Sequence, residues 1–188
     1  MYLRLLDNAY RAAPAGVRPT TEPRLILGSR YLGEVVPDTD AVQNVIGVTF
    51  LREQRYGEAV TAFRQALALN ADSIDANRNL AAALADSGHP TDAIGYLRHA
   101  VRLDPRNGTT QYALGRLLLD RREFGEASEC FRAALQSMPD SSSLHNDLGV
   151  ALASTGDLQD AADQFRQAVS LDPEFAEARR NLAVAERR

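Results

Sequence analysis

The side chains that most often ligate metals, or act as nucleophile and base, are few in this chain. They are three histidines, His89, His99 and His145, and one cysteine, Cys130. A metal site needs three or four such ligands close together, and a nucleophile needs a base beside it. The histidines are too scattered along the chain for either role, and Cys130 precedes Phe131 on an apolar face. We therefore expect structural histidines, a buried and inert thiol, no metal site and no catalytic residues.

Lysine is absent, and all 21 basic residues are arginine. A Walker-type phosphate loop, a kinase nucleotide site, a Schiff base and a Ser-Lys dyad each need a lysine amine, so the composition excludes them. The chain has no glycine-rich phosphate loop, and its carboxylates are dispersed without a pair set apart as acid and base. We expect no cofactor and no enzymatic activity.

The composition is that of a globular protein with a core. Of 188 residues, 45% are apolar and 24% are charged, and the net charge is −4. No apolar run reaches the roughly 18 residues of a membrane span, and residues 1–16 lack the apolar segment of a signal peptide. We expect a cytoplasmic protein without disulfides, and the negative charge argues against a nucleic-acid partner.

A period of 34 residues organises the sequence. Pro37, Pro105, Pro139 and Pro173 are spaced by this period or its double, and Ala71 stands at the missing place in the series. With Asp40 as position 1, the period divides the chain into four contiguous units. These units are residues 40–73, 74–107, 108–141 and 142–175.

Each unit has the apolar spacing of two helices. Position 7 is large and apolar, position 8 is glycine or alanine, positions 20 and 27 are alanine, and position 24 is phenylalanine or leucine. Spacings of three and four residues place 7, 8 and 11 on one helix face and 20, 24 and 27 on another. The small residues let two antiparallel helices approach, and position 24 fills the space between units. An acid at position 19 suits the start of the second helix, and the proline at position 32 ends it.

The pattern resembles the tetratricopeptide repeat family, most clearly in "LGRLLLDRREFGEASECFRAALQSMP" and "LGVALASTGDLQDAADQFRQAVSLDP". The resemblance covers residues 40–175 and implies an all-α, right-handed solenoid of stacked antiparallel hairpins. The sequence departs from the family at position 4, where Gln43, Asn77, Gln111 and His145 replace a common aromatic, and at Ala71. We expect these departures to loosen the packing.

The two flanks continue the pattern less regularly. Residues 176–188 repeat the start of a unit, but Glu186 occupies the apolar position 11, which predicts a C-terminal capping helix with a polar face. Residues 1–39 contain two apolar-periodic stretches joined by "PAGVRPTTEP", and we interpret them as a degenerate helical hairpin. A partner-bound or dimerising segment is the alternative.

Stacking of such hairpins curves the array and places the first helices on its concave side. Arg78, Tyr112 and Arg116 would form a cationic and aromatic centre there, suited to an extended peptide because arginines pair with carboxylates and tyrosine offers apolar area. The resemblance implies that groove asparagines hold the backbone of a target, although Val45 and Ala113 interrupt that series. The predicted peptide-binding residues are Asn44, Arg78, Asn79, Tyr112, Arg116, Asn146, Asp147, Arg180 and Asn181.

Three functions remain open. The leading hypothesis is a non-catalytic adaptor that binds a protein or peptide partner in its groove. The others are a self-assembling scaffold, with the N-terminal hairpin or the capping helix as subunit contact, and a regulatory arm or fragment of a larger enzyme.

Arginine recurs at position 25, and we interpret it as a solvated face paired with Glu129 and Asp163; a nucleic-acid stripe is the alternative. The position-25 residues are Arg64, Arg98, Arg132 and Arg166.

Overall fold

The fold is known from a computed structural model, which describes residues 39–187. Residues Thr39–Arg188 form one compact unit, and the hairpin expected for residues 1–39 lies outside the described residues except for Thr39. Within 39–187 all regular structure is helical. The helices are α3 (Asp40–Arg52), α4 (Tyr56–Leu69), α5 (Ile74–Asp86), α6 (Pro90–Leu103), α7 (Gly108–Asp120), α8 (Phe124–Leu135), α9 (Ser142–Thr155), α10 (Leu158–Leu171) and α11 (Ala176–Ala185).

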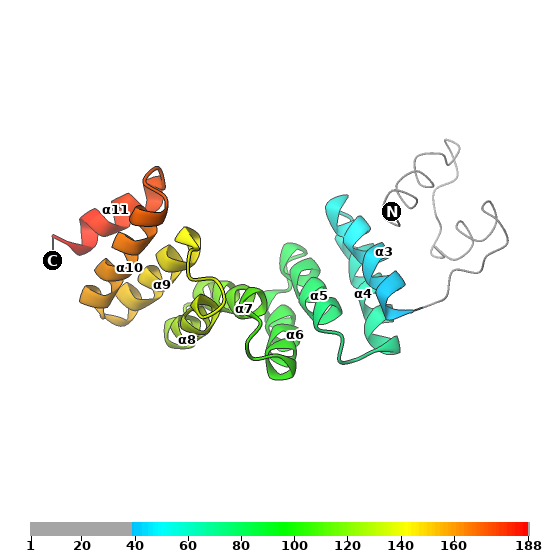
Figure 1. The fold of residues 1–188 in the computed structure, drawn as a ribbon. Coiled ribbons are helices and arrows are strands. Elements are labelled where there is room, and N and C mark those ends of the chain that lie inside the picture. The colour runs from blue at the N-terminus through cyan, green and yellow to red at the C-terminus, as the bar shows by residue number, and fades with distance from the viewer. Residues whose placement is uncertain (1–38, 188) are drawn as a thin grey trace. The chain divides into compact units, whose positions relative to one another are not determined.

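The helices pack in pairs, in the order of the sequence. The closest pairs are α3 with α4, α5 with α6, α7 with α8 and α9 with α10, and each second helix also packs against the next first helix. Figure 1 shows these hairpins following one another, with α11 packed on the last of them. The predicted all-α solenoid of stacked hairpins with a C-terminal capping helix is confirmed.

Side chains at position 34 start the first helices. Thr39, Ser73, Asn107 and Ser141 each accept a hydrogen bond from the backbone N–H three residues later, which satisfies one of the free donors at a helix N-terminus. The second helices begin without such a cap, but an acidic residue lies in the first turn of each, as predicted. The capping helix α11 follows Phe175, which provides no side-chain cap.

The turn inside each hairpin needs one left-handed residue, always at position 15. Gly88 and Gly156 adopt φ of 86° and 97°, and Gln54 and Arg122 adopt 59° and 62°. Glycine takes this conformation without a steric cost, whereas a residue with a Cβ atom does not. The four turns are thus built alike on different residues.

Proline at position 32 follows the second helices as expected, but α4 shows that it is not required to end them. Helix α4 ends at Leu69, two residues before Ala71, and α6 and α10 end at the same position, two residues before their prolines. In α4, the residue after the helix is Asn70, which is extended and donates from its side chain to Asp40 at 2.9 Å. In this hairpin the helix therefore ends without a proline.

The core of each hairpin is a large side chain on a small one. Phe63, Phe131 and Phe165 are buried against glycine at position 8 of their own hairpin, so close that a Cβ atom at Gly115 or Gly149 would lie 2.5 Å from a ring carbon. This contact lies within the hairpin, whereas the sequence suggested a filling between units. The alanines at positions 20 and 27 are fully buried, as expected.

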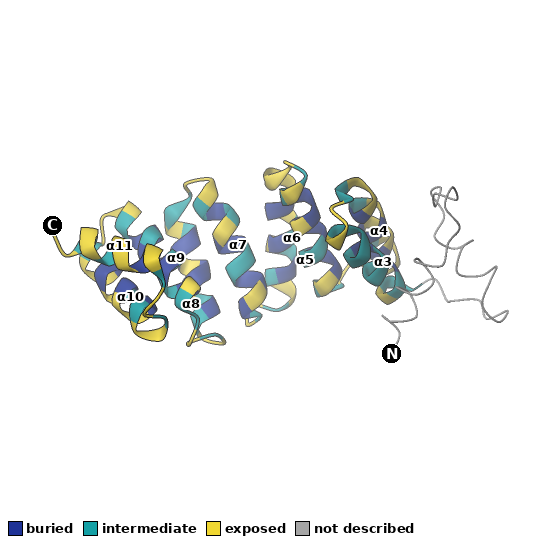
Figure 2. Ribbon diagram, turned by 90° about the horizontal axis from the view of Figure 1, so that it is seen from above, coloured by how far each residue is buried: buried dark blue, intermediate teal, exposed yellow. Residues whose placement is uncertain are grey.

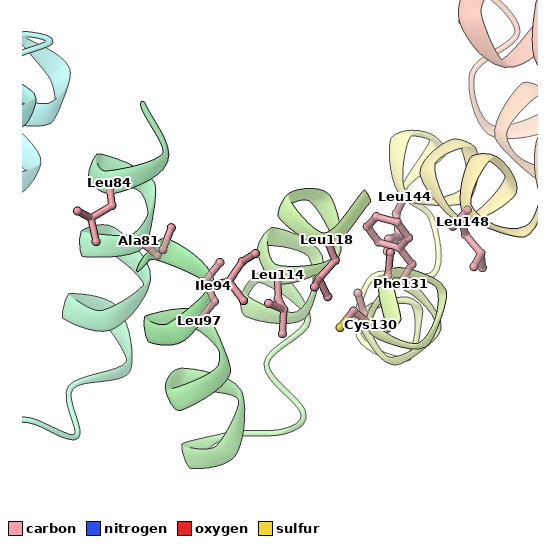
Figure 3. Packing of buried hydrophobic residues seen from close by; sticks show 14 of the residues in the cluster. Ala81, Leu84, Ile94, Leu97, Leu114, Leu118, Cys130, Phe131, Leu144 and Leu148 are labelled. Carbon is pink, nitrogen blue, oxygen red and sulfur yellow. The ribbon is translucent and has the colours of Figure 1, made fainter. Parts of the chain in front are cut away.

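The second hairpin uses a different pair at the same positions, Ala81 and Leu97. Leucine is smaller than phenylalanine, so the methyl group of Ala81 finds room. Figure 3 shows Ala81 and Leu97 in the buried cluster that also contains Phe131, and Figure 2 shows buried residues alternating with exposed ones within the helices.

Among the described helices, none has both the length and the apolar character needed to cross a membrane.

Candidate functional site

Polar side chains on neighbouring first helices are joined by a repeated hydrogen bond. Position 5 of one unit meets position 6 of the next, 35 residues later in the chain. The bonds run from Asn79 Nδ2 to Asn44 Oδ1 (3.0 Å), from Tyr112 Oη to Asp147 Oδ2 (2.9 Å) and from Asn181 Nδ2 to Asn146 Oδ1 (2.9 Å). We call these six residues the first-helix ladder. All six are among the predicted binding residues.

The ladder is interrupted between α5 and α7, where position 6 is Ala113. Arg78 instead donates to Thr109 on α7 at 3.2 Å and pairs with Asp75 on its own helix at 2.8 Å. The contact between α5 and α7 is also the sparsest between neighbouring first helices in the described part of the chain. No hydrogen bond or ion pair within residues 39–187 joins Arg78 to Tyr112 or Arg116. The two arginines of the predicted centre therefore belong to separate networks.

Arg116 forms a network with Tyr112 and Asp147 and is its outward-facing member. Its Nη1 atom lies 3.4 Å from Tyr112 Oη and 3.6 Å from Asp147 Oδ2. The Arg116 side chain is 54% exposed, whereas that of Asp147 is 15% exposed. The Tyr112 ring packs on Phe131 with centroids 5.9 Å apart, which fixes the phenol on the core. A partly buried carboxylate and a packed phenol thus hold a guanidinium group that faces solvent.

Burial dominates the ionisation of this network. It raises the pKa of the Asp147 carboxyl group, and the Tyr112 hydrogen bond and the Arg116 charge act in the opposite direction. Burial also raises the pKa of Tyr112 above its usual value of 10.0. The phenol is therefore protonated at neutral pH and donates its proton to the Asp147 carboxylate.

At the C-terminal end, the predicted residues divide into buried and exposed groups. Asn146 is buried and, besides accepting from Asn181, donates to Glu177 at 3.5 Å. Arg180 is exposed, and within residues 39–187 it makes no hydrogen bond or ion pair. Arg180 and Arg116 are therefore the two arginines of the predicted set that are most available to a ligand.

The polar residues at position 4 have a structural role that the sequence did not reveal. Asn77, Gln111, His145 and Arg179 each reach the backbone carbonyl at position 32, six residues earlier, over 2.9 to 3.4 Å. They tie the link between hairpins to the next first helix, so the predicted loosening at this position is wrong. A polar residue at position 4 in every unit was the signal for this contact.

The two remaining histidines contact neighbouring polar side chains, and the cysteine is buried. His89 precedes α6 and lies 3.3 Å from Ser87, and His99 contacts Asp72 at 3.4 Å and Arg102 at 3.2 Å. Cys130 is buried, and burial raises the pKa of its thiol to about 11, which agrees with an inert cysteine. Among the described residues, no three His, Cys, Asp or Glu side chains form a group that could hold a metal ion.

The arginines at position 25 are only partly paired. Arg98 binds Glu126 of the next second helix through both carboxylate oxygens, and Arg166 pairs with Asp163 and Glu186. The predicted pairing with Asp163 is therefore present, but Glu129 makes no ion pair with Arg132 in the described structure. Arg64 and Arg132 are exposed and without hydrogen bonds or ion pairs within residues 39–187.

Three shallow cavities lie beside the second helices. One of about 340 Å³ lies between α8 and α10 over Leu148 and Leu152, and one of about 360 Å³ lies between α10 and α11. The third, of about 380 Å³, lies between α4 and α6. No residue of the first-helix ladder lines any of these three cavities.

Solved structures of similar fold include those of MamA and YrrB. A crystal structure of MamA superposes with a TM-score of 0.74 at 22% identity, covering 79% of this chain and 81% of that one. MamA 41-end from Desulfovibrio magneticus RS-1 gives 0.74 at 20% identity, with 78% and 83% covered. YrrB, described as a TPR protein with an unusual peptide-binding site, gives 0.68 at 22% identity, with 75% and 73% covered.

Sequence comparison gives the family. The curated protein O-mannosyl-transferase Tmtc3 of Drosophila melanogaster is 31% identical over 118 residues, which are 61% of this chain but only 13% of that protein. The tetratricopeptide repeat family model matches residues 45–108, 112–173 and 155–188, which together make up most of the chain. The chain therefore belongs to the tetratricopeptide repeat family.

Proposed function

We propose that this chain is a non-catalytic, cytoplasmic adaptor that binds an extended segment of a partner protein along its first helices. Membership of the family supports a protein-interaction adaptor or scaffold. The observation that carries the choice of face is the first-helix ladder, a line of hydrogen-bonding side chains with the solvent-facing Arg116 beside it. The peptide-binding site in the printed description of YrrB supports the same class of ligand.

The ladder offers two kinds of contact to an extended segment. Asparagine side chains present both a donor and an acceptor, as a peptide backbone does. The hydrogen bond between Asn44 and Asn79 can therefore be replaced by hydrogen bonds from each of them to a ligand. Arg116 and Arg180 can each pair with a carboxylate through two parallel hydrogen bonds. We expect a partner segment that carries acidic residues.

The proposal also includes the bounds of the repeats and the class of partner. We take residues 40–73, 74–107, 108–141 and 142–175 as the four repeats, 176–188 as the cap and 1–39 as a degenerate hairpin. A protein partner is favoured over nucleic acid because the chain has a net charge of −4 and the Arg98 and Arg166 side chains are paired with acids.

A display library of random peptides provides a test without a known partner. Peptides selected on the full wild-type chain would be measured by fluorescence anisotropy against a variant carrying Asn79→Ala, Tyr112→Phe and Arg116→Ala. Phenylalanine keeps the packing on Phe131 and removes the hydroxyl group. We expect the affinity to fall by about tenfold or more, since each lost charged hydrogen bond is worth about 1.5–3 kcal/mol.

The matched control carries Arg64→Ala and Arg132→Ala, which remove exposed arginines away from the ladder. We expect this control to bind the selected peptides as the wild type does. Equal affinity for wild type and ladder variant, or a loss in the control alone, would overturn the proposal.

Self-assembly is the second candidate, and the uncovered face of α11 favours it. In the four hairpins position 8 is covered by the second helix, whereas Ala183 at position 8 of α11 is exposed and the adjacent Val184 is 57% exposed. Self-assembly predicts that light scattering gives a mass that is a multiple of 20.5 kDa. Val184→Glu should reduce this mass. A monomer at all concentrations would remove this candidate.

A further inference from the structure

The cavity between α4 and α6 lies where the first and second repeats each depart from the others. It has a volume of about 380 Å³, within the range of ligand-binding pockets. The elements around it are labelled in Figure 1. Its lining residues are Leu67, Ala71, Asn77, Asp92, Gly95, Tyr96, His99 and Arg102.

Gly95 opens this cavity, and the described chain offers no packing reason for a glycine there. It is the sixth residue of α6, and a Cβ atom built on it meets no other atom within 4 Å. The other repeats have Thr61, Glu129 and Asp163 at this position. Because glycine inside a helix destabilises it relative to alanine, the space above Gly95 is kept open at a cost in stability.

A second departure meets the first in the same cavity. Ala71 stands where the other repeats have proline, and its smaller side chain forms part of the wall. Its carbonyl oxygen accepts from Asn77 Nδ2 at 2.9 Å, as does that of Ser73, so the wall is held in place. Two sequence exceptions that lie 24 residues apart therefore shape one space.

The walls are apolar, and the rim carries one unpaired acid. Leu67 and Tyr96 form the apolar walls, with Tyr96 offering an aromatic surface. On the rim, His99 already contacts both Asp72 and Arg102. Asp92 makes no hydrogen bond or ion pair within residues 39–187, so its carboxylate is available to a cation.

We propose that the cavity between α4 and α6 binds one aromatic side chain of a protein partner, on a segment whose adjacent positive charge pairs with Asp92. An aromatic ring fits because it can pack against Tyr96 in an offset or edge-on geometry and cover Leu67. The pocket lies beside the second helices, so a partner could occupy it independently of a segment on the first-helix ladder.

Two small probes that share a phenylethyl group and carry opposite charges test the chemistry. Phenethylamine carries a phenyl ring and an ammonium group, and 3-phenylpropanoate carries the same ring and a carboxylate. Titrated into the full chain and followed by amide NMR shifts, phenethylamine should saturate shifts at Leu67, Gly95 and Tyr96 with a Kd of about 1–10 mM, as expected for so small a ligand. It should bind about three- to fivefold more tightly than 3-phenylpropanoate, and Asp92→Asn should abolish this difference.

Filling the cavity is the second arm. Gly95→Gln should weaken phenethylamine binding by about tenfold while leaving the thermal midpoint of unfolding unchanged or higher, because the glutamine enters open space in a helix. The matched control is Gly125→Gln in α8, whose Cβ also meets no atom within 4 Å and which lines none of the three cavities. It should bind as the wild type does.

Three results would overturn the proposal. They are the absence of saturable shifts at the three reporter residues, equal affinity in wild type and Gly95→Gln, and an unchanged preference for the amine in Asp92→Asn. The ladder variant should bind phenethylamine as the wild type does, so failure of the pocket and failure of the ladder as a binding site are distinguishable.

Discussion

The hairpins α5/α6 and α7/α8 have one backbone plan and two different interiors. In α7/α8, the Phe131 ring lies against Gly115, and a left-handed Arg122 forms the turn. In α5/α6, Leu97 and Ala81 occupy the same positions and glycine forms the turn. The comparison shows that the repeat conserves the combined volume of two facing positions rather than either residue.

The same two hairpins also differ in how they meet their neighbours. The contact between α7 and α9 includes the hydrogen bond from Tyr112 to Asp147, whereas between α5 and α7 the corresponding place is Ala113 and the helices touch least. The second repeat also has the open space above Gly95. Departures from the repeat are therefore concentrated around α5 and α6.

Removal of the large side chain should produce the largest effect. Phe131→Ala leaves a cavity over Gly115 and should lower the free energy of unfolding by about 3–5 kcal/mol, more than Leu97→Ala because the lost ring is larger. Urea denaturation measures both. Arg132→Ala, next to Phe131 but exposed, should cost well under about 1 kcal/mol, and equal costs for Phe131 and Arg132 would contradict the register of the repeat.

Converting one interior into the other is the sharper test. Gly115→Ala should cost about 1–3 kcal/mol, because the new methyl group would lie 2.5 Å from a carbon of the Phe131 ring. Adding Phe131→Leu recreates the pair found in α5/α6 and should restore part of the loss, so that the double variant unfolds at higher urea than Gly115→Ala alone.

The control for this cycle is Gly125→Ala, which adds a methyl group to α8 in open space. It should be neutral or stabilising, since alanine favours a helix. Purely additive costs in the Gly115 and Phe131 cycle would show that the two positions are not coupled.

The hydrogen bond from Tyr112 to Asp147 joins α7 and α9 and has no counterpart between α5 and α7. The stability of the chain should depend on pH because of its Asp147 carboxyl group. Burial raises the pKa of Asp147 above its usual value of 3.8 in the folded chain, so the folded state holds this proton more tightly than the unfolded state does. Its contribution to stability is therefore present at low pH and is lost as the pH rises through the folded pKa. Asp147→Asn cannot titrate.

The stability of Asp147→Asn relative to wild type should consequently rise between about pH 3 and about pH 7. Thermal unfolding of both proteins across this range measures the difference. A difference that stays constant, or that falls with pH, would show that burial does not control this carboxyl group.

The turns should give the smallest effect. Arg122→Gly removes a Cβ atom from a left-handed residue and should stabilise the chain by up to about 1 kcal/mol, whereas Gly88→Ala in the other hairpin should destabilise it by about as much. Differential scanning calorimetry resolves both shifts. Shifts of the same sign would mean that the two turns are not equivalent.

The hairpins could be predicted from the sequence because the requirement for small residues at close contacts repeats every 34 residues, as at Ala127 and Ala134. The expected proline at position 32 is not required to end the second helix, since α4 ends at Leu69 without one. The caps at position 34 had a sequence signal, because a Ser, Thr or Asn stands there in each case, but the apolar pattern takes no account of polar residues. These residues are Thr39, Ser73, Asn107 and Ser141.

The site could be predicted only as a face. The periodicity placed Tyr112 and Asp147 on equivalent sides of two helices, but their hydrogen bond depends on how neighbouring hairpins stack, which the sequence period does not contain. For the same reason, Arg78 was predicted together with Arg116, although its own neighbours Asp75 and Thr109 hold it. The cavity above Gly95 needs three helices to form and had no signal beyond two exceptions to the repeat.

The central claim is that a partner segment lies along the first helices, and NMR shift mapping tests it most directly. A peptide selected on the wild-type chain would be titrated into isotope-labelled protein, with all amide signals of residues 39–187 followed. The account predicts the largest shifts at Tyr112, Arg116 and Asn146 on α7 and α9, and small ones on α4, α6, α8 and α10. Shifts confined to the second helices would contradict it.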